Sequence, residues 1–564
     1  MIALIFSWIL YTALSYPFGF SVFNLIFRKK KENEVGPNFF ITCIVGIFII
    51  TAIASFLSIF IKLGLAALVI ISLIGLLLFV FQFKKIKETL LSAVKKSHLP
   101  SWFLSLALLL LVFAIWFTIR PADNYDTGLY HAQSIRWLEE FGVVKGLGNF
   151  HERLTFNSSW FVTTASFSLS FLGHSLHLVN GWLFAIFAFF LLSGFSVFWT
   201  RECKLSDIAK ILFFPLLIYI YIDGISSPSP DLPNSVMVWA VIILFLNKVD
   251  RRKFAFDYET MAITILAFFA FTIKLSSAPI VLVPIYLLIK ERKTLTIQQL
   301  FFAFLTVILI DTPFIVRNII QSGYLIYPFV YINIFNFDWK IPGYLVVDVQ
   351  RTTTNWAKVG SSEDPLLHQG FGAWIPAWYQ AKSLFNKILL DLTLFLSLFS
   401  LSFWMPFAIK KNTQKTFRIE PFVVLTLIAG IGFAFWFVSA PDFRYGYVFI
   451  IPMIALLLIP IVKYLIDHFP KTQFIFFSAG LFFLMYSLFI RYGLLQFSDI
   501  SNHLKLPPDY QKTVVNANII NDKKILSPSY GDQCWYADLP CTPYPSTKLK
   551  WRGDTLKDGF YWKD

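Results

Sequence analysis

The sequence has few charged residues, and this scarcity decides the class of protein. Only 14% of the 564 residues are charged, whereas 57% are hydrophobic and 65 are phenylalanine. A soluble domain has about a quarter of its residues charged, so a large soluble helical protein is excluded. Apolar runs of roughly twenty residues recur along the chain, and each is long enough to cross about 30 Å of hydrocarbon. The chain is therefore predicted to be an all-α polytopic membrane protein.

Other features are also scarce. The centres of the apolar runs are almost free of charge, and no internal repeat is visible. Transporters usually place ionisable groups near the middle of the membrane and break helices in related halves, so both absences disfavour transport. The spacing of acidic residues and histidine matches no strong metal motif. Cys43 and Cys203 lie in or beside apolar runs, where a small buried hydrophobe is the ordinary interpretation.

About fourteen transmembrane helices are predicted from the apolar runs. They are expected near residues 3–27, 38–61, 65–83, 101–119, 176–199, 206–222, 232–247, 257–273, 276–290, 297–316, 384–409, 421–439, 446–466 and 473–490. The first run has no basic segment before it, so we expect a retained helix and not a cleaved signal. We divide the chain into N-terminal helices (1–99), a central helical bundle (100–490) and a small polar tail (491–564).

The formal net charge of +15 comes mostly from clusters in short gaps between the apolar runs. Such clusters mark cytoplasmic loops under the positive-inside rule, so they indicate a lipid bilayer as partner and not a nucleic acid. The main clusters lie at residues 28–31, 84–87, 95–96, 248–253 and 410–418. With the N-terminus outside, all of them are cytoplasmic. This pattern predicts a multi-pass protein of a bacterial inner (plasma) membrane with both termini extracytoplasmic.

The same arrangement makes two long loops external, at residues 120–175 and 317–383, together with the tail. Within the first loop, a semi-apolar stretch at 157–172 is expected to form an amphipathic helix along the membrane interface. Cys534 and Cys541 lie close together in the tail. Because an extracytoplasmic compartment is oxidising, we predict a disulfide between them.

Two carboxylates, Asp123 and Asp126, emerge at the membrane surface where the fourth apolar run ends. A short helix is expected to follow, with Thr127 as its N-cap. A carboxylate beside a helix start is electrostatically favourable, so an ordinary capping aspartate is one interpretation of Asp126. His131 and Arg136 follow in the same helix. This density of polar groups against a bilayer favours a functional site.

Charged and polar residues also stand at the ends of other helices on the external side. Asp231 lies in a turn rich in serine and proline, and Lys274 ends a helix, where a snorkelling lysine is the alternative. Arg317 and Asn318 begin the second long loop, and Arg444 lies in a short turn. Because most other basic residues are cytoplasmic, these cations indicate a bound anion. The planar fork of arginine suits a phosphate at the membrane surface.

Two segments resemble the GT-C superfamily of membrane glycosyltransferases, which take sugars from polyprenyl-phosphate carriers. One is the acidic start of the first long loop, Tyr-Asp-Thr-Gly-Leu-Tyr-His at 125–131. The other, at 317–328, is similar to a stretch common in bacterial members, although Tyr324 and Leu325 replace the usual Asn-Pro. The resemblance covers residues from about 100 to 490. The whole chain also resembles an uncharacterised family of bacterial polytopic membrane proteins with a cysteine-containing tail.

The resemblance implies inverting-type transfer of a sugar from a polyprenyl-phosphate-linked donor to an extracytoplasmic acceptor, which is a glycan, a lipid or a protein. Asp126 is the expected base and Asp123 the alternate. The expected substrate-binding residues are His131, Arg136, Lys274, Arg317, Asn318 and Arg444. No cofactor is expected, although the two carboxylates and the histidine leave room for a divalent metal. Two alternatives stay open: a transporter or flippase of lipid-linked saccharide, and a surface-polysaccharide polymerase or ligase.

Overall fold

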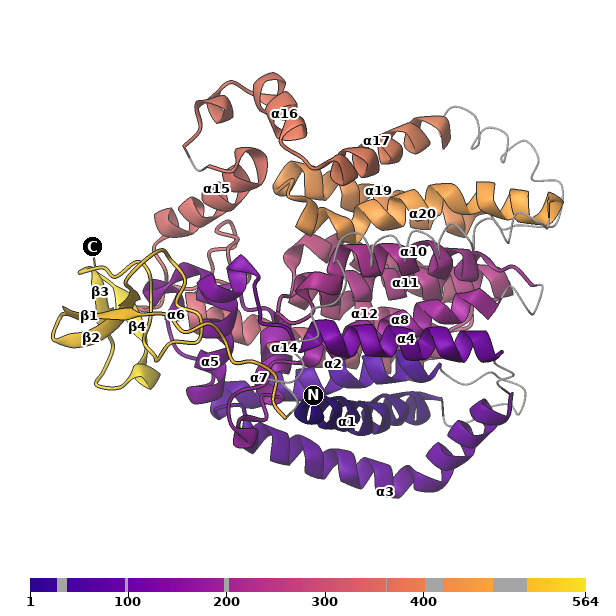
Figure 1. Ribbon diagram of the computed structural model, residues 1–564, viewed down its shortest axis with the longest axis horizontal. Coiled ribbons are helices and arrows are strands. Elements are labelled where there is room, and N and C mark those ends of the chain that lie inside the picture. The colour runs from indigo at the N-terminus through magenta and orange to yellow at the C-terminus, as the bar shows by residue number, and fades with distance from the viewer. Residues whose placement is uncertain are drawn as a thin grey trace.

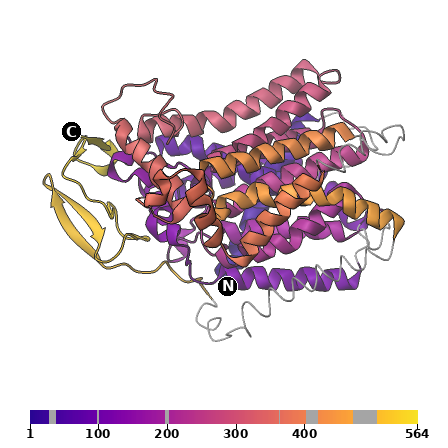
Figure 2. The same cartoon turned by 90° about the horizontal axis from the view of Figure 1, so that it is seen from above.

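The computed structural model describes residues 1–27, 38–96, 100–196, 202–361, 363–400, 419–469 and 505–563. Long helices run side by side along the molecule, and the shorter elements gather at one end of them (Figure 1). A view turned by 90° shows the same separation (Figure 2). We call this end, formed by residues 120–178, 323–383 and 505–563, the loop end. The beginning of the first helix also lies there, because the N–H of Ala3 donates to the carbonyl of Lys505.

Ten helices in the described ranges are long and apolar enough to cross a membrane. They are α1 (Ile2–Ile26), α2 (Phe39–Phe60), α3 (Leu65–Lys96), α4 (Ser101–Thr118), α8 (Val179–Leu192), α10 (Leu205–Tyr221), α11 (Asp231–Arg251), α14 (Ile297–Ser322), α19 (Ile419–Ser439) and α20 (Phe443–His468). The chain is thus a helical membrane protein, as the apolar runs predict.

Three shorter helices lie at other segments where the sequence predicts a crossing. They are α12 (Tyr258–Ile273), α13 (Leu282–Glu291) and α17 (Leu384–Phe399). Between α12 and α13 the chain forms a 3-10 helix, η6 (Leu275–Val281). The helix predicted at 473–490 lies outside the described residues.

Burial in the bundle follows the position of each helix. In α11 every residue from Val236 to Leu246 is buried, so this helix lies at the centre. In contrast, α3 exposes Phe81 and several leucines, as a helix facing lipid does. Helices α1 and α2 approach closely at Gly19 and Gly46. A Cβ on Gly46 would lie 1.7 Å from the carbonyl oxygen of Ser15, so only glycine permits this contact.

The elements of the loop end are short. The first long loop forms η1 (Thr127–His131), α5 (Ala132–Glu140), α6 (Leu147–Phe150), η2 (Glu152–Thr155) and α7 (Ser159–Ser166), and the second forms α15 (Gly343–Val359) and α16 (Phe371–Gln380). The prediction of an amphipathic interfacial helix at 157–172 is wrong, because α7 is shorter and all of its residues are buried. Its hydroxyl groups donate to carbonyls one turn earlier, as Thr163 does to Ser159 and Thr164 to Trp160, which makes the polar face compatible with burial.

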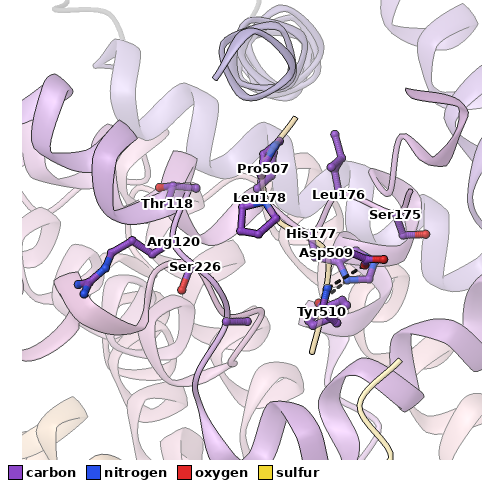
Figure 3. A pocket seen from close by; sticks show the side chains of 12 residues that line it. Thr118, Arg120, Ser175, Leu176, His177, Leu178, Ser226, Pro507, Asp509 and Tyr510 are labelled. Carbon is purple, nitrogen blue, oxygen red and sulfur yellow. Dashed lines mark hydrogen bonds between the residues drawn. The ribbon is translucent and has the colours of Figure 1, made fainter. Parts of the chain in front are cut away.

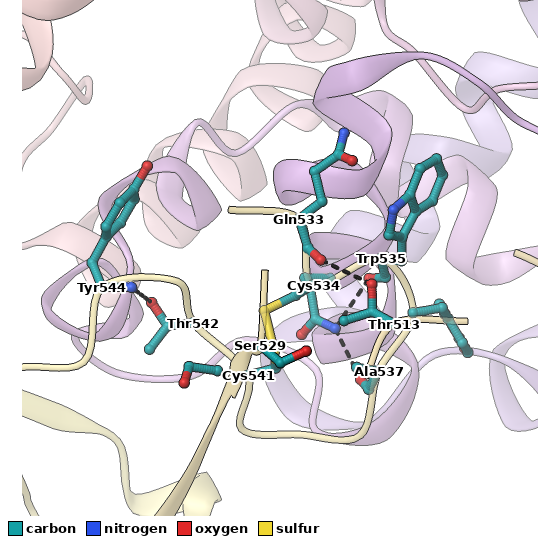
Figure 4. The surroundings of a disulfide bond; sticks show 12 residues. Thr513, Ser529, Gln533, Cys534, Trp535, Ala537, Cys541, Thr542 and Tyr544 are labelled. Atoms are coloured by element: carbon teal, nitrogen blue, oxygen red, sulfur yellow. Dashed lines mark hydrogen bonds between the residues drawn. A yellow bond between two sulfur atoms is a disulfide. The ribbon is translucent and has the colours of Figure 1, made fainter. Parts of the chain in front are cut away.

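The tail is not an unstructured polar segment. It forms two antiparallel pairs of strands, β1 (Val515–Ile520) with β2 (Lys523–Pro528), and β3 (Leu549–Trp551) with β4 (Phe560–Trp562). Cys534 and Cys541 form the disulfide that their spacing predicts, with Cα atoms 6.1 Å apart (Figure 4). The tail packs against the first long loop. The N–H of Trp535 donates to the carbonyl of Gly128 at 2.8 Å.

Candidate functional site

The helix that carries Asp126 starts earlier than the sequence predicts. It begins at Tyr125, and the side-chain oxygen of Asn124 accepts a hydrogen bond from the Asp126 N–H at 3.0 Å. The predicted N-cap at Thr127 is therefore wrong, because Asn124 takes that role. The next turn, η1, is π-helical, and within it the Thr127 hydroxyl lies 3.1 Å from Nδ1 of His131. Single π-helical turns inside α-helices occur frequently at functional sites.

Asp126 forms an ion pair with Arg444, which lies in the first turn of α20. The Asp126 Oδ2 atom accepts from Nη1 of Arg444 at 3.0 Å. Asp442 caps α20 by accepting from the Arg444 N–H at 2.9 Å, and its carboxylate lies 3.7 Å from Nε of Arg444. One guanidinium thus lies between two carboxylates, and it brings together segments that are 318 positions apart.

A second ion pair joins Asp231 and Lys274. Nζ of Lys274, at the end of α12, donates to Asp231, at the start of α11. The hydroxyl of Ser229 also donates to the carboxylate of Asp231, at 3.2 Å. The ammonium of Lys274 lies 4.2 Å from the centre of the Tyr445 ring, which favours the cation by a cation–π interaction. Lys274 therefore has a specific partner and does not simply extend toward the interface.

His131 connects the two ion pairs electrostatically. It is 2% exposed and feels the charges of Asp126, Asp231, Lys274 and Arg444. Burial lowers the pKa of His131 to about 4, and this effect outweighs the two carboxylates. The imidazole is therefore neutral at pH 7. We call these five residues, Asp126, His131, Asp231, Lys274 and Arg444, the charged cluster.

A cavity of about 120 Å³ lies beside the charged cluster. Its lining includes Asp231 and Arg444 together with Asn124, Asn180 and Tyr447. The amide of Asn180 donates to the carbonyls of Ser227 and Ser229 and so holds the serine-rich turn that precedes Asp231.

Asn124, Asn180 and Tyr445 are components of this site that sequence reasoning missed. For Asn180 a signal exists, because a lone amide in an otherwise apolar helix has to find a partner in the protein. Nothing local in the sequence marks Asn124 or Tyr445, whose neighbours Asp126 and Arg444 attract attention first.

The remaining predicted residues lie elsewhere. Asp123 is exposed, and its carboxylate has no hydrogen bond or ion pair within the described part of the chain. Arg136 turns toward the tail, where it donates to the carbonyl of Tyr536 at 2.5 Å and to Asp538 at 2.8 Å. Arg136 therefore helps to attach the tail to α5. No hydrogen bond or ion pair joins Asp123 or Arg136 to the charged cluster among these residues.

Arg317 and Asn318 are buried in α14, each 1% exposed. The Nε and Nη1 atoms of Arg317 and both side-chain polar atoms of Asn318 have no hydrogen-bond partner among the described residues. A buried cation without a partner is costly, so such a group usually has a ligand or an ion. No hydrogen bond or ion pair of the described ranges joins Arg317 to the charged cluster.

A polar network attaches the tail to α5. The ring of His177 lies 2.5 Å from the hydroxyl of Tyr510 (Figure 3), and its other nitrogen lies 2.9 Å from Oε1 of Glu139. The hydroxyl of Tyr536 also donates to Glu139. The adjoining pocket has a volume of only about 30 Å³. It has room for little more than one water molecule, so we assign this network to tail attachment.

The described residues contain no group of three or more His, Cys, Asp or Glu side chains that could hold a metal ion. The fold and the charged cluster thus define a polytopic helical membrane protein with a cavity, lined in part by Asp231 and Arg444, at one end of its bundle. A family model described as Domain of unknown function (DUF8201) matches residues 1–451, so the chain belongs to that family. No curated protein and no solved structure matches the chain.

Proposed function

We propose that this protein is a membrane glycosyltransferase that moves a sugar from a polyprenyl-phosphate donor to an acceptor outside the cytoplasm. The observation that carries the proposal is the contact of Asp126 with Arg444 beside a cavity at the loop end. It supplies a proton acceptor and a phosphate-binding cation together, which are the two groups that sugar transfer from a lipid phosphate requires. The resemblance of residues 125–131 and 317–328 to GT-C enzymes supports the same reaction.

The reaction consists of one displacement. The acceptor hydroxyl oxygen forms a bond to the anomeric carbon, and its proton passes to the carboxylate of Asp126. The bond between the anomeric carbon and the phosphate oxygen breaks, and its electron pair leaves with polyprenyl phosphate. Attack opposite the leaving group inverts the anomeric configuration. His131, which is neutral at pH 7, orients the turn that carries Asp126 through Thr127.

The phosphate group is bound in this proposal by the cations of the loop end. Arg444 has five N–H donors, of which one donates to Asp126, so donors remain for an anion at the cavity it lines. Lys274 contributes positive charge while it holds Asp231. Arg317 and Asn318, whose buried polar atoms lack protein partners in the described ranges, form a separate candidate for anion binding.

An apolar groove suits the hydrocarbon part of the donor. It has a volume of about 360 Å³ and lies between α17, α19 and α20, with Phe422, Leu427, Met453 and Leu456 among its lining residues. Met453 follows Arg444 by nine residues in α20, which is about 14 Å along a helix. A carrier with its phosphate at Arg444 would reach the groove with its first isoprene units.

In this proposal the loop end faces the extracytoplasmic side of a bacterial inner membrane. The chain then crosses the bilayer about fourteen times, with the shorter helices α12, α13 and α17 and the segment 473–490 included. The acceptor is a glycan, a lipid or a protein. A polymerase or ligase of surface polysaccharide would use the same donor and the same residues and would differ only in its acceptor.

The test compares Asp126→Asn with Asp123→Asn in the purified full-length protein. We expect Asp126→Asn to lower transfer about a hundredfold or more, because the amide keeps the size of the side chain but cannot accept a proton. Asp123→Asn is the matched control, since Asp123 lies outside the charged cluster. Transfer is measured with a panel of synthetic polyprenyl-phosphate sugars, by mass spectrometry of the polyprenyl phosphate released. Unchanged activity in both variants would refute the mechanism.

One observation favours the transporter or flippase alternative. Asp311 lies inside the apolar helix α14, and its Oδ1 atom is buried without a hydrogen-bond partner in the described ranges. Ionisable residues within membrane helices often belong to proton or substrate pathways. Asp311→Asn therefore distinguishes the two functions. It should leave sugar transfer by the enzyme intact, whereas in a proton-coupled transporter it would abolish uptake of a lipid-linked saccharide into proteoliposomes.

A further inference from the structure

A second and larger cavity lies at the loop end, on the side covered by the tail. Its volume is about 490 Å³, within the range of sites that bind small molecules. Three segments distant in sequence form its walls: η2 with the residues before it, α15, and the part of the tail around residues 544–562. In Figure 1, α6, α15 and the tail strands all lie at the loop end. We call this cavity the tail cleft.

The lining of the tail cleft combines charged groups, hydroxyls and aromatic rings. Glu152, Arg153 and Asp348 supply the charges, and Tyr544 and Trp562 supply the rings. Three hydroxyl side chains, Thr352, Thr353 and Ser546, also line it. Asp348 has a partner in Arg351, at 2.6 Å. The side chains of Glu152 and Arg153 form no hydrogen bond or ion pair with any described residue.

This combination fits a saccharide better than the other ligand classes. Carboxylate and guanidinium groups hydrogen-bond to hydroxyls, while an aromatic ring packs against the apolar face of a sugar. A polyanion would require charges of a single positive sign, but here the carboxylates outnumber the arginine among the groups that line the cleft. A lipid chain would require an apolar wall, as in the groove beside α20.

The tail cleft is also linked to the helix that carries Asp126. Arg153 and Tyr544 both interact electrostatically with Tyr125, the residue before Asp126, and Arg153 also interacts with Tyr130 in the same helix. The hydroxyl of Tyr125 donates to Asp532 of the tail at 2.6 Å. The tail thus contacts the residue next to Asp126, and the carboxylate of Asp126 itself contacts Arg444.

We propose that the tail cleft binds a neutral oligosaccharide, which is the sugar acceptor. Arg153 and Glu152 bind its hydroxyls, and Tyr544 packs against one ring. The claim that this oligosaccharide is the acceptor rests on the proposed function. The claim that the cleft binds an oligosaccharide does not. The acceptor hydroxyl would enter from the tail cleft and the donor phosphate from the side of Arg444, so that the two substrates meet at Asp126.

The first experiment measures binding without turnover. Saturation-transfer NMR is recorded on the full-length protein in nanodiscs with maltotriose, cellotriose and chitotriose as neutral probes and trigalacturonate as an acidic one, each at millimolar concentration. At least one neutral trisaccharide should bind. Tyr544→Ala and Arg153→Gln should weaken it about tenfold, which corresponds to about 1.4 kcal/mol. Tyr530→Ala is the matched control, because Tyr530 is in the same tail and 95% exposed.

The second experiment separates this inference from the proposed function. In the transfer assay, Tyr544→Ala and Arg153→Gln should raise the KM for the acceptor and change kcat little, whereas Tyr530→Ala should change neither. Binding of no neutral trisaccharide, preference for trigalacturonate, or equal binding by the two cleft variants and the control would overturn the cleft assignment. If a neutral trisaccharide binds as expected but no polyprenyl-phosphate sugar in the panel is turned over, the proposed function fails and the oligosaccharide site stands.

Discussion

His131 lies among four charged side chains and is itself neutral at pH 7, because burial lowers its pKa to about 4. The imidazole has a pKa of about 6.5 when the chain is unfolded. Below that value the unfolded state binds a proton that the folded state does not, so folding stability is lost as the pH falls from 6.5 toward 4. Because His131 contacts Thr127, this loss of folding stability is expected in the π-helical turn that follows Asp126.

We predict that the helix over residues 125–140 opens more readily at pH 5 than at pH 7. The expected loss is about 2 kcal/mol, from the difference between the two pKa values over this range. Hydrogen exchange of the backbone amides, corrected for intrinsic rates, measures it. His131→Gln removes the titrating group and should abolish the difference. An equal pH effect in that variant would assign the change to other groups.

At the scale of elements, the attachment of the tail to η1 depends on one glycine. A Cβ on Gly128 would lie 2.7 Å from the ring of Trp535 and 2.9 Å from the side chain of Gln533. The same residue accepts the hydrogen bond from the Trp535 N–H. The side chain of Gln533 in turn donates to the carbonyl of Tyr125 at 2.9 Å. Tail and helix therefore share a contact that a larger residue would separate.

We predict that Gly128→Ala loosens the tail. The added methyl group has to displace a ring and a side chain at once, so protease cleavage between residues 505 and 563 should become faster. Sugar transfer should fall with it, because the tail borders Asp126 through Tyr125. Gly372→Ala in α16 is the matched control, since a Cβ there meets no atom within 4 Å. Cleavage rates measured by mass spectrometry that are alike in the two variants would contradict the role of Gly128.

The elements also show where sequence reasoning ends. The long helices were predictable because an apolar run of membrane length has no alternative to a helix in lipid. The conformation of 157–172 was not predictable. Its hydroxyl groups suggest a polar face at the interface, but in α7 they donate hydrogen bonds to backbone carbonyls of the same helix. The strands of the tail were also missed, since their apolar residues are too few and too irregular to give a clear alternation.

The charged cluster was predictable in part for the same kind of reason. Asp126, Lys274 and Arg444 all stand at helix ends on one face, and helix topology brings these ends together. Arg317 stands at that face as well, but the direction of its side chain around α14 depends on packing that the sequence does not reveal. The contact of Arg136 with the tail could not be predicted either, because its partner lies about 400 positions later in the sequence.

At the scale of the whole molecule, the two ends of the bundle differ in chemistry. The charged cluster, the tail cleft and the disulfide lie at the loop end. Lys290 lies in the last turn of α13, Arg292 and Lys293 follow this helix, and all three belong to the opposite end. Under the positive-inside rule, this distribution of charge predicts that the loop end faces the outside.

We predict that Glu363→Cys is modified by an impermeant maleimide in intact cells and that Lys293→Cys is not. Both side chains are exposed, so accessibility differs only through the side of the membrane. The variants are made in a Cys203→Ser background, because Cys203 is half-buried while Cys43 is fully buried. Lysis before labelling is the control and should make both positions reactive. Reaction of Lys293→Cys in unbroken cells would reverse the orientation and remove the proposed access to an external acceptor.

The attachment of the tail to the first long loop has a consequence for biosynthesis. Gln133 donates to the carbonyl of Trp535, a residue that the ribosome adds about 400 positions later. Arg444, the partner of Asp126, also follows Asp126 by 318 positions and is synthesised long after it. For most of translation, the groups of the first long loop that later contact the tail and Arg444 therefore have water as their hydrogen-bonding partner. A nascent or truncated chain would contain the first helices of the bundle without the Asp126–Arg444 ion pair, so the charged cluster forms only after Arg444 has been synthesised.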